Sequence, residues 1–138
     1  MKILFAALFC ILSLNSFVFA EEILIIVNNN GPLVNISDED IKKIYKGEKR
    51  FEAGVKIIPV ELEGIKAQFL TSFMNTTSKD YRVHWTKKVF QDGIQPPATM
   101  PSIDDVVELV KMENGAIGYV GRKGFKDESD IKIIKTIK

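Results

Sequence analysis

The sequence predicts an α/β protein in which helices flank a small mixed β-sheet. Three observations lead to this fold class. Short runs of β-branched residues alternate with segments of helical periodicity, several helical segments follow a serine that can cap them, and turn residues separate the two kinds of segment. The chain of 138 residues contains no internal repeat, low-complexity tract or long linker, so one mature domain is expected.

The first twenty residues have the organisation of a secretion signal. Lys2 supplies a positive start, residues 3–12 are almost entirely apolar, and Ala20 ends a tripeptide that approximates a cleavage site. The apolar run is too short to span a membrane, and no basic anchor follows it. We therefore expect cleavage near Ala20, one mature domain over residues 21–138 without a membrane span, and a periplasmic or secreted location.

The first strand and the first helix are predicted from local pattern. Residues 23–27 form a continuous β-branched and leucine run, which indicates a strand buried on both faces. Asparagines, glycine and proline at 28–32 then form a turn. Ser37 is predicted to cap a helix that Gly47 ends. The apolar stripe of this helix consists of Ile41, Ile44 and Tyr45.

A second strand is expected over residues 56–62, where Pro59 argues for an edge position or a bulge. Gly64 ends it, and a helix follows. Ser78 is predicted to cap a third helix. Spacing on these two helices places five aromatic residues in the core: Phe69, Phe73, Tyr81, Trp85 and Phe90.

The last third of the chain is predicted to alternate between irregular segments and regular ones. Residues 95–101 contain three prolines and are expected to be irregular. Ser102 begins a fourth helix, and Gly115 follows its end. Strands are expected at 116–120 and 131–137, which gives the order β-α-β-α-α-α-β-β.

Charge and composition exclude several classes of function. The chain has 19 basic and 18 acidic side chains, and loss of Lys2 with the signal makes these numbers equal, so no net field attracts nucleic acid. The only cysteine, Cys10, lies in the signal, and His84 is the only histidine. A disulfide framework, a thiol nucleophile and a multi-histidine zinc site are thereby excluded. With no nucleophile–base pair, we expect a protein that is not an enzyme and uses no cofactor or metal.

Several ordered segments carry a resemblance to a known family. The most specific is Gly-Ala-Ile-Gly-Tyr-Val at 115–120, and the others lie at 36–41, 44–47, 51–54 and 85–97. Together they resemble the phosphate-type substrate-binding proteins of bacterial ABC transporters, in the periplasmic binding protein type 2 superfamily. Full-length members bind an oxyanion between two lobes, whereas this chain resembles one lobe, the second.

The resemblance implies phosphate or another oxyanion as ligand, an ABC permease or other envelope protein as partner, and a role in uptake. It also implies an anion site at the strand-to-helix turn of residues 60–69, where free amides and the helix dipole favour an anion. A homodimer or a partner protein would have to supply the second surface of such a site.

The expected turn departs from the family pattern, because Glu61 and Glu63 replace the arginine and Ile65 replaces a hydroxyl residue. The remaining candidate ligand residues at the turn are Gly64, Ile65, Lys66 and Gln68. Asn29 and Asn30 are further candidates, because they follow the first strand at its carboxyl end. The alternative is a helix start capped by Glu63, with Lys66 solvated, and a polar turn at the asparagines.

Other polar residues have simple structural explanations. Glu61 and Glu63 could serve acid–base chemistry or hold a cation, but solvation at the surface is the favoured reading. His84 could shuttle protons, but a partly buried structural role is favoured. A basic stretch consists of Lys42, Lys43, Lys46, Lys49 and Arg50. Complementing the helix dipole is its favoured role, and the alternative is docking of an acidic partner or a phosphate-rich polymer.

The function predicted is therefore a secreted or periplasmic phosphate-type substrate-binding-protein-like domain for ABC-type uptake. The alternative is a non-enzymatic envelope interaction module that has kept the fold and lost the ligand.

Overall fold

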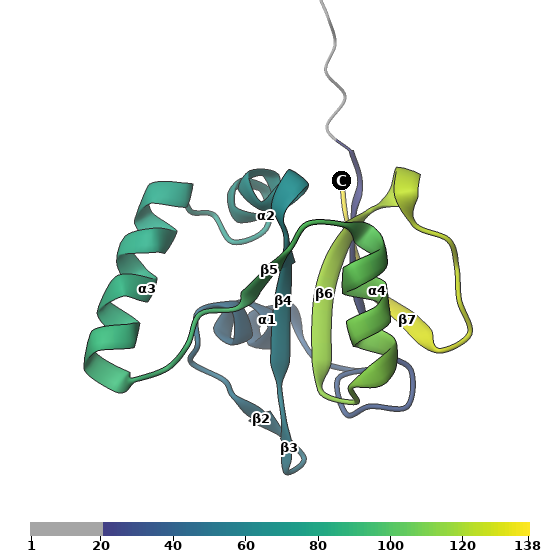
Figure 1. Ribbon diagram of the computed structural model, residues 1–138, viewed down its shortest axis with the longest axis horizontal. Helices are drawn as coiled ribbons and strands as arrows, with labels where there is room; N and C mark the ends of the chain where they lie inside the picture. The colour runs from purple at the N-terminus through teal and green to yellow at the C-terminus, as the bar shows by residue number, and fades with distance from the viewer. Residues whose placement is uncertain (1–20) are drawn as a thin grey trace, which may run out of the picture.

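The computed structural model describes residues 21–138 and has the α/β fold predicted from the sequence (Figure 1). The secretion signal predicted for residues 1–20 lies outside the described residues. A five-stranded mixed sheet has the order β5-β4-β6-β1-β7, and β2 and β3 form a separate hairpin. The strands are β1 (Ile23–Asn28), β2 (Phe51–Glu52), β3 (Val55–Lys56), β4 (Ile58–Leu62), β5 (Ala98–Met100), β6 (Ala116–Gly121) and β7 (Ile131–Ile137).

Four helices and two short 3-10 turns complete the described fold. The helices are α1 (Asp38–Tyr45), α2 (Lys66–Ser72), α3 (Ser78–Asp92) and α4 (Ile103–Met112), and the 3-10 turns are η1 (Glu63–Ile65) and η2 (Arg122–Gly124). No helix among residues 21–138 is long and apolar enough to cross a membrane.

Side-chain caps explain where three helices begin. The hydroxyl oxygens of Ser37 and Ser102 each accept a backbone N–H three residues ahead, at 3.2 Å, which confirms both predicted caps. The predicted cap at Ser78 is wrong by one residue, because Thr77 Oγ1 accepts the Asp80 N–H at 3.1 Å. Threonine caps almost as well as serine, so adjacent hydroxyl residues compete for this position.

The directions of the strands place their carboxyl ends at different ends of the sheet. β1 is completely buried, as predicted, and runs antiparallel to both β6 and β7. β4 runs parallel to β5 and β6. The carboxyl ends of β4 and β1 therefore lie at opposite ends of the sheet.

Helices cover both faces of β6. Gly118 faces α4, since a methyl group there would lie 2.6 Å from Val106 Cγ1. The next residue, Tyr119, points to the opposite face because side chains alternate along a strand. There its ring stacks on Phe69 of α2, with centroids 3.9 Å apart, and lies near Tyr45 of α1. α3 stands to the side of this sandwich, beyond the β4–β5 edge (Figure 1).

The prediction that the whole proline-rich segment 95–101 is irregular is wrong, because part of it is a strand. Ala98, Thr99 and Met100 form β5 and pair in parallel with Val60–Leu62 of β4. The prolines at 96, 97 and 101 lie outside this strand, so the three residues between them keep their amides. Prolines next to an edge strand are a usual way of limiting its length.

Pro59 lies inside β4, at a point where the strand has a neighbour on one side. The Ile58 N–H donates to the Gly115 carbonyl oxygen at 2.8 Å, beside β6. The backbone nitrogen of the next residue, Pro59, points away from β6, on the side where β5 begins to pair one residue later, at Val60. The missing N–H thus faces a local edge, although β4 as a whole is an interior strand.

Two further details differ from the prediction. The β2–β3 hairpin was not predicted; its turn residues Ala53 and Gly54 have positive φ angles of 48° and 77°, typical of tight hairpins.

Phe90 is 85% exposed rather than part of the core. It lies about 2.5 helical turns beyond Tyr81, which places it on the opposite face of α3 from that buried residue.

The close packing of α4 on β6 predicts a large difference between two glycine substitutions. Gly118→Ala should lower the free energy of unfolding by about 1–3 kcal/mol, because the added methyl overlaps Val106. Gly64→Ala is the control and should change it by less than about 0.5 kcal/mol, since no atom lies within 4 Å of its added methyl. Urea denaturation measures both, and equal effects would contradict this packing.

Candidate functional site

A cavity of about 680 Å³ lies between α3 and the β4–β5 edge, and we call it the α3 cleft. Its polar lining includes Glu61, Glu63, Lys66, Arg82 and Thr99. Its apolar lining includes Trp85, Val89, Phe90, Pro96 and Pro97. An apolar cavity of this size with a few convergent polar groups is typical of small-molecule binding sites.

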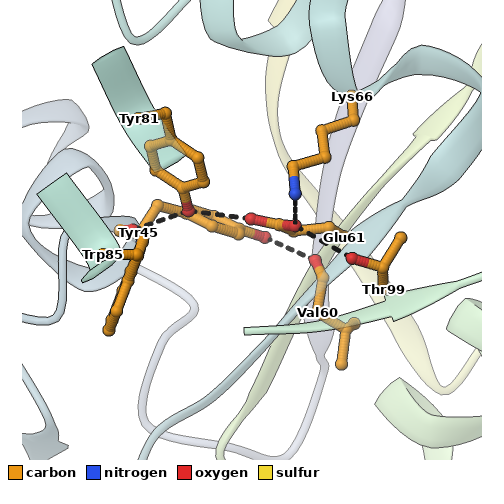
Figure 2. Close-up of polar contacts among 7 residues, drawn as sticks. All are labelled: Tyr45, Val60, Glu61, Lys66, Tyr81, Trp85 and Thr99. Carbon is orange, nitrogen blue, oxygen red and sulfur yellow. Dashed lines mark hydrogen bonds and ion pairs between the residues drawn. The ribbon is translucent and has the colours of Figure 1, made fainter. Parts of the chain in front are cut away.

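Glu61 lies at the polar end of the α3 cleft and is buried, with only 2% of its surface exposed. Figure 2 shows donors from three elements around its carboxylate. Tyr81 Oη lies 2.7 Å from Oε1, while Thr99 Oγ1 donates to Oε2 at 3.2 Å. The predicted surface position of Glu61 is therefore wrong. These two hydroxyls and the Lys66 ammonium satisfy the buried carboxylate and make its burial tolerable.

Lys66 neutralises this carboxylate. Its ammonium lies 2.7 Å from Glu61 Oε2 and 5.5 Å from the centre of the Tyr81 ring. The Lys66 side chain is 34% exposed, so the ion pair has one buried and one partly solvated member. Lys66 is thus already bound to an internal anion.

α3 is attached to the body through the end of α1. Tyr81 Oη and Trp85 Nε1 lie 2.8 Å and 3.1 Å from the Tyr45 carbonyl oxygen, and His84 Nε2 lies 2.8 Å from that of Lys46. The last carbonyls of a helix lack partners within it, and the Trp85 N–H satisfies that of Tyr45, so the single Tyr81 hydroxyl proton remains for the Glu61 carboxylate. His84 has the partly buried position that was favoured for it.

The same region raises the pKa of three tyrosines above its ordinary value of 10.0. Burial is the main cause for Tyr45, Tyr81 and Tyr119, because it disfavours the phenolate. The negative charge of Glu61 adds to the effect at each of them. The cluster therefore stays protonated well into the alkaline range.

Of residues 64–68 in the predicted turn, Lys66 and Ala67 line the α3 cleft. The Lys66 backbone N–H donates to the Glu63 carbonyl oxygen. Gln68 Nε2 donates to the Glu21 carbonyl oxygen at 2.6 Å, away from the cleft. Gly64 is exposed and Ile65 packs against the core. An anion site built from these four residues stays a prediction, and two of its donors have internal partners.

The asparagines after β1 do not line the α3 cleft. Asn28, the last residue of β1, is buried, and its Nδ2 donates to the carbonyl oxygens of Val110 and Lys111, at 3.0 and 3.1 Å. Its Oδ1 accepts the Asn30 N–H at 2.8 Å. Because β1 and β4 end at opposite ends of the sheet, Asn29 and Asn30 are not brought together with the Gly64–Lys66 turn.

Other sequence candidates are placed as follows. Glu63 lines the α3 cleft together with Glu61, although it begins the η1 turn and does not extend β4 as the sequence had suggested. In the basic stretch, Lys49 pairs with Glu52 at 2.7 Å and the Lys42 ammonium lies 5.2 Å from the Phe73 ring centre. No group of three potential metal ligands occurs among the described residues.

Sequence reasoning placed Tyr81 and Trp85 in the core but missed their polar contacts and gave no role to Arg82 or Thr99. The available signal was chemical: a buried tyrosine or tryptophan needs a hydrogen-bond partner. Two such residues on one helix face could have indicated a polar attachment, although not its partner.

Comparison with known proteins identifies the fold. No family model and no curated protein matches the sequence. Two similar solved structures are an ABC-type phosphate transport receptor from Vibrio cholerae, with a TM-score of 0.60, and a phosphate ABC transporter substrate-binding protein with bound phosphate from Clostridium perfringens, with 0.62. Each is 19% identical over 83% of this chain, which covers 46% and 44% of the respective structure.

PstS from Borrelia burgdorferi is also similar, with a TM-score of 0.53 and 19% identity over 74% of this chain and 41% of its own. At the level of fold, the neighbours are therefore phosphate ABC transporter substrate-binding proteins, as the sequence resemblance implied. The chain spans less than half the length of each of these structures.

The role of Glu61 predicts unequal effects of two glutamine substitutions. Glu61→Gln should lower the free energy of unfolding by about 1–3 kcal/mol, because it removes a charged acceptor from three donors. Glu63→Gln, the matched control in the same cleft, should change it by less than about 0.5 kcal/mol because Glu63 is exposed. Urea denaturation compares them, and equal losses would contradict the role given to Glu61.

The raised tyrosine pKa values predict unfolding in alkali. The contribution of these tyrosines to the free energy of unfolding should be fully present below pH 10.0 and fall as the pH rises above it. There the tyrosines of the unfolded chain ionise, while those of the folded chain keep their protons. Tyrosinate absorbance and circular dichroism should therefore change together. Ionisation near pH 10.0 with unchanged circular dichroism would refute the burial of these three hydroxyls.

Proposed function

We propose that the protein is an exported, non-enzymatic substrate-binding module that holds its solute in the α3 cleft. The observation that carries this proposal is the composition of the cleft. A buried, hydrogen-bonded carboxylate at one end and aromatic and proline side chains along the wall offer orientation and apolar burial together. The transport binding proteins that share the fold support a binding role rather than an enzymatic one.

Phosphate or another oxyanion is the first solute to consider. In its favour, Lys66 and Arg82 carry cationic donors into the α3 cleft, and a structural neighbour contains bound phosphate. Against it, the Glu61 carboxylate neutralises Lys66 at 2.7 Å, and Glu63 adds a second negative charge to the lining. We therefore expect weak oxyanion affinity in the native protein.

The proposal includes export through residues 1–20, a periplasmic or extracellular location, and cooperation with an ABC permease. A second surface from a homodimer or a partner protein would close the cleft. The mass of the mature protein in solution, measured by light scattering, tests the homodimer: twice the monomer mass supports it, and the monomer mass contradicts it.

A second candidate function is an envelope interaction module that has lost solute binding. Phe90 favours it, because this large apolar side chain is 85% exposed at the cleft. Affinity capture from envelope extract separates the two functions. The interaction module should retain a defined protein whether or not solute is added.

The proposed function predicts a fluorescence response to solute. Trp85 lines the α3 cleft and is the only tryptophan, so its emission reports on occupancy. The mature protein should be titrated with phosphate, sulfate, amino acids and short peptides, with calorimetry in parallel. At least one of these solute classes should give a saturable change in emission, accompanied by heat.

Trp85→Phe is the control for the optical signal, because it removes the fluorophore and leaves an aromatic side chain in the cleft. Heat of binding in this variant without an emission change would confirm the source of the signal. If no solute class saturates either signal at millimolar concentration, the substrate-binding proposal fails and the interaction module remains.

A further inference from the structure

We propose that the α3 cleft binds a peptide of about three residues, with free charged ends and an apolar side chain, that adds as a strand to β5. This inference rests on the proposed function, because it names the solute class for the same cleft. It follows from the contrast between the two edges of the sheet, the length of β5, and the charges around the cleft.

The two edge strands of the sheet differ in their protection. β7 carries Lys132 and Lys135, and the latter pairs with Asp38 at 2.9 Å. Charged side chains, lysine above all, discourage pairing at such an edge. β5, the other edge, contains no charged residue and pairs only with β4 within residues 21–138. β5 lies on the side of the sheet nearest α3 (Figure 1), and Thr99 lines the α3 cleft.

The flanking prolines limit what can pair with β5. Pro97 and Pro101 have no N–H to donate, so only the three residues between them can form a regular ladder. An added strand gains affinity from main-chain hydrogen bonds and specificity from the side chains that it places in neighbouring pockets. A short peptide therefore fits this edge better than a long strand from a partner protein.

The wall of the α3 cleft offers a place for an apolar side chain. Trp85, Val89 and Phe90 come from α3, and Pro96 and Pro97 come from the segment that leads from α3 to β5. Phe90 is 85% exposed, so a ligand that covered it would remove a large apolar surface from water.

The charges around the cleft favour a ligand with both signs of charge. Glu61 and Lys66 neutralise each other. Arg82 and Glu63 are exposed, line the same cleft and form no ion pair within residues 21–138. One unpaired cation and one unpaired carboxylate complement the carboxylate and ammonium ends of a free peptide, whereas phosphate would be repelled by Glu63.

The tripeptide Ala-Leu-Ala is a suitable probe, followed by Trp85 emission and by calorimetry on the mature protein. We expect saturable binding of the free tripeptide and at least tenfold weaker binding of its acetylated, amidated form, which lacks both end charges. A version methylated at the leucine amide should also bind more weakly, because it cannot complete the ladder with β5.

Two variants test the charged ends. Arg82→Gln and Glu63→Gln should each weaken tripeptide binding by about tenfold, the lower range for loss of a charge-assisted hydrogen bond. Lys79→Gln is the matched control, because Lys79 is exposed on α3 and outside the cleft lining, and it should leave affinity unchanged.

Equal affinity for the free and capped peptides, or no saturable signal from Ala-Leu-Ala at millimolar concentration, would overturn the inference. If another solute still saturates Trp85 emission, only the peptide inference fails. If no solute does, the proposed function fails with it.

Discussion

The buried carboxylate of Glu61 determines how three elements meet at one end of the sheet. Tyr81 from α3, Thr99 from β5 and Lys66 from α2 all contact it, within 2.7–3.2 Å. A carboxylate without such partners would be costly to bury, so the position of one β4 residue constrains the helix, the edge strand and the lysine together. The polar end of the α3 cleft forms where these three contacts meet at the Glu61 carboxylate.

The position of α3 explains why a cleft remains beside that point. Tyr81, His84 and Trp85 attach the first half of this helix to the carbonyls at the end of α1. The second half, with Val89 and Phe90, lies beyond these contacts and lines an open cavity instead of a core. Because α3 has polar contacts at one end and exposed apolar side chains at the other, it forms a wall of the α3 cleft.

Prediction from sequence succeeded where the signal was local. The buried strand β1, the caps at Ser37 and Ser102, and β7 depend on residues a few positions apart. β5 was missed because three residues between prolines become a strand only when β4 lies beside them. Phe90 was misplaced because the turn of the helix carries it away from the buried face that Tyr81 and Trp85 define.

The sequence by itself determined the α/β class, the elements with strong local patterns, and a content of one cysteine and one histidine that rules out a disulfide within the chain or a multi-histidine site. Only the tertiary structure decided which polar residues meet. It separated Asn29 and Asn30 from the Gly64–Lys66 turn, because β1 and β4 run in opposite directions. It also showed that Glu61, which was expected at the surface, is buried. The sequence could not reveal this, because the three partners of Glu61 come from segments up to 38 positions away. Strand direction and such distant contacts are properties of the packed chain, and no local pattern encodes them.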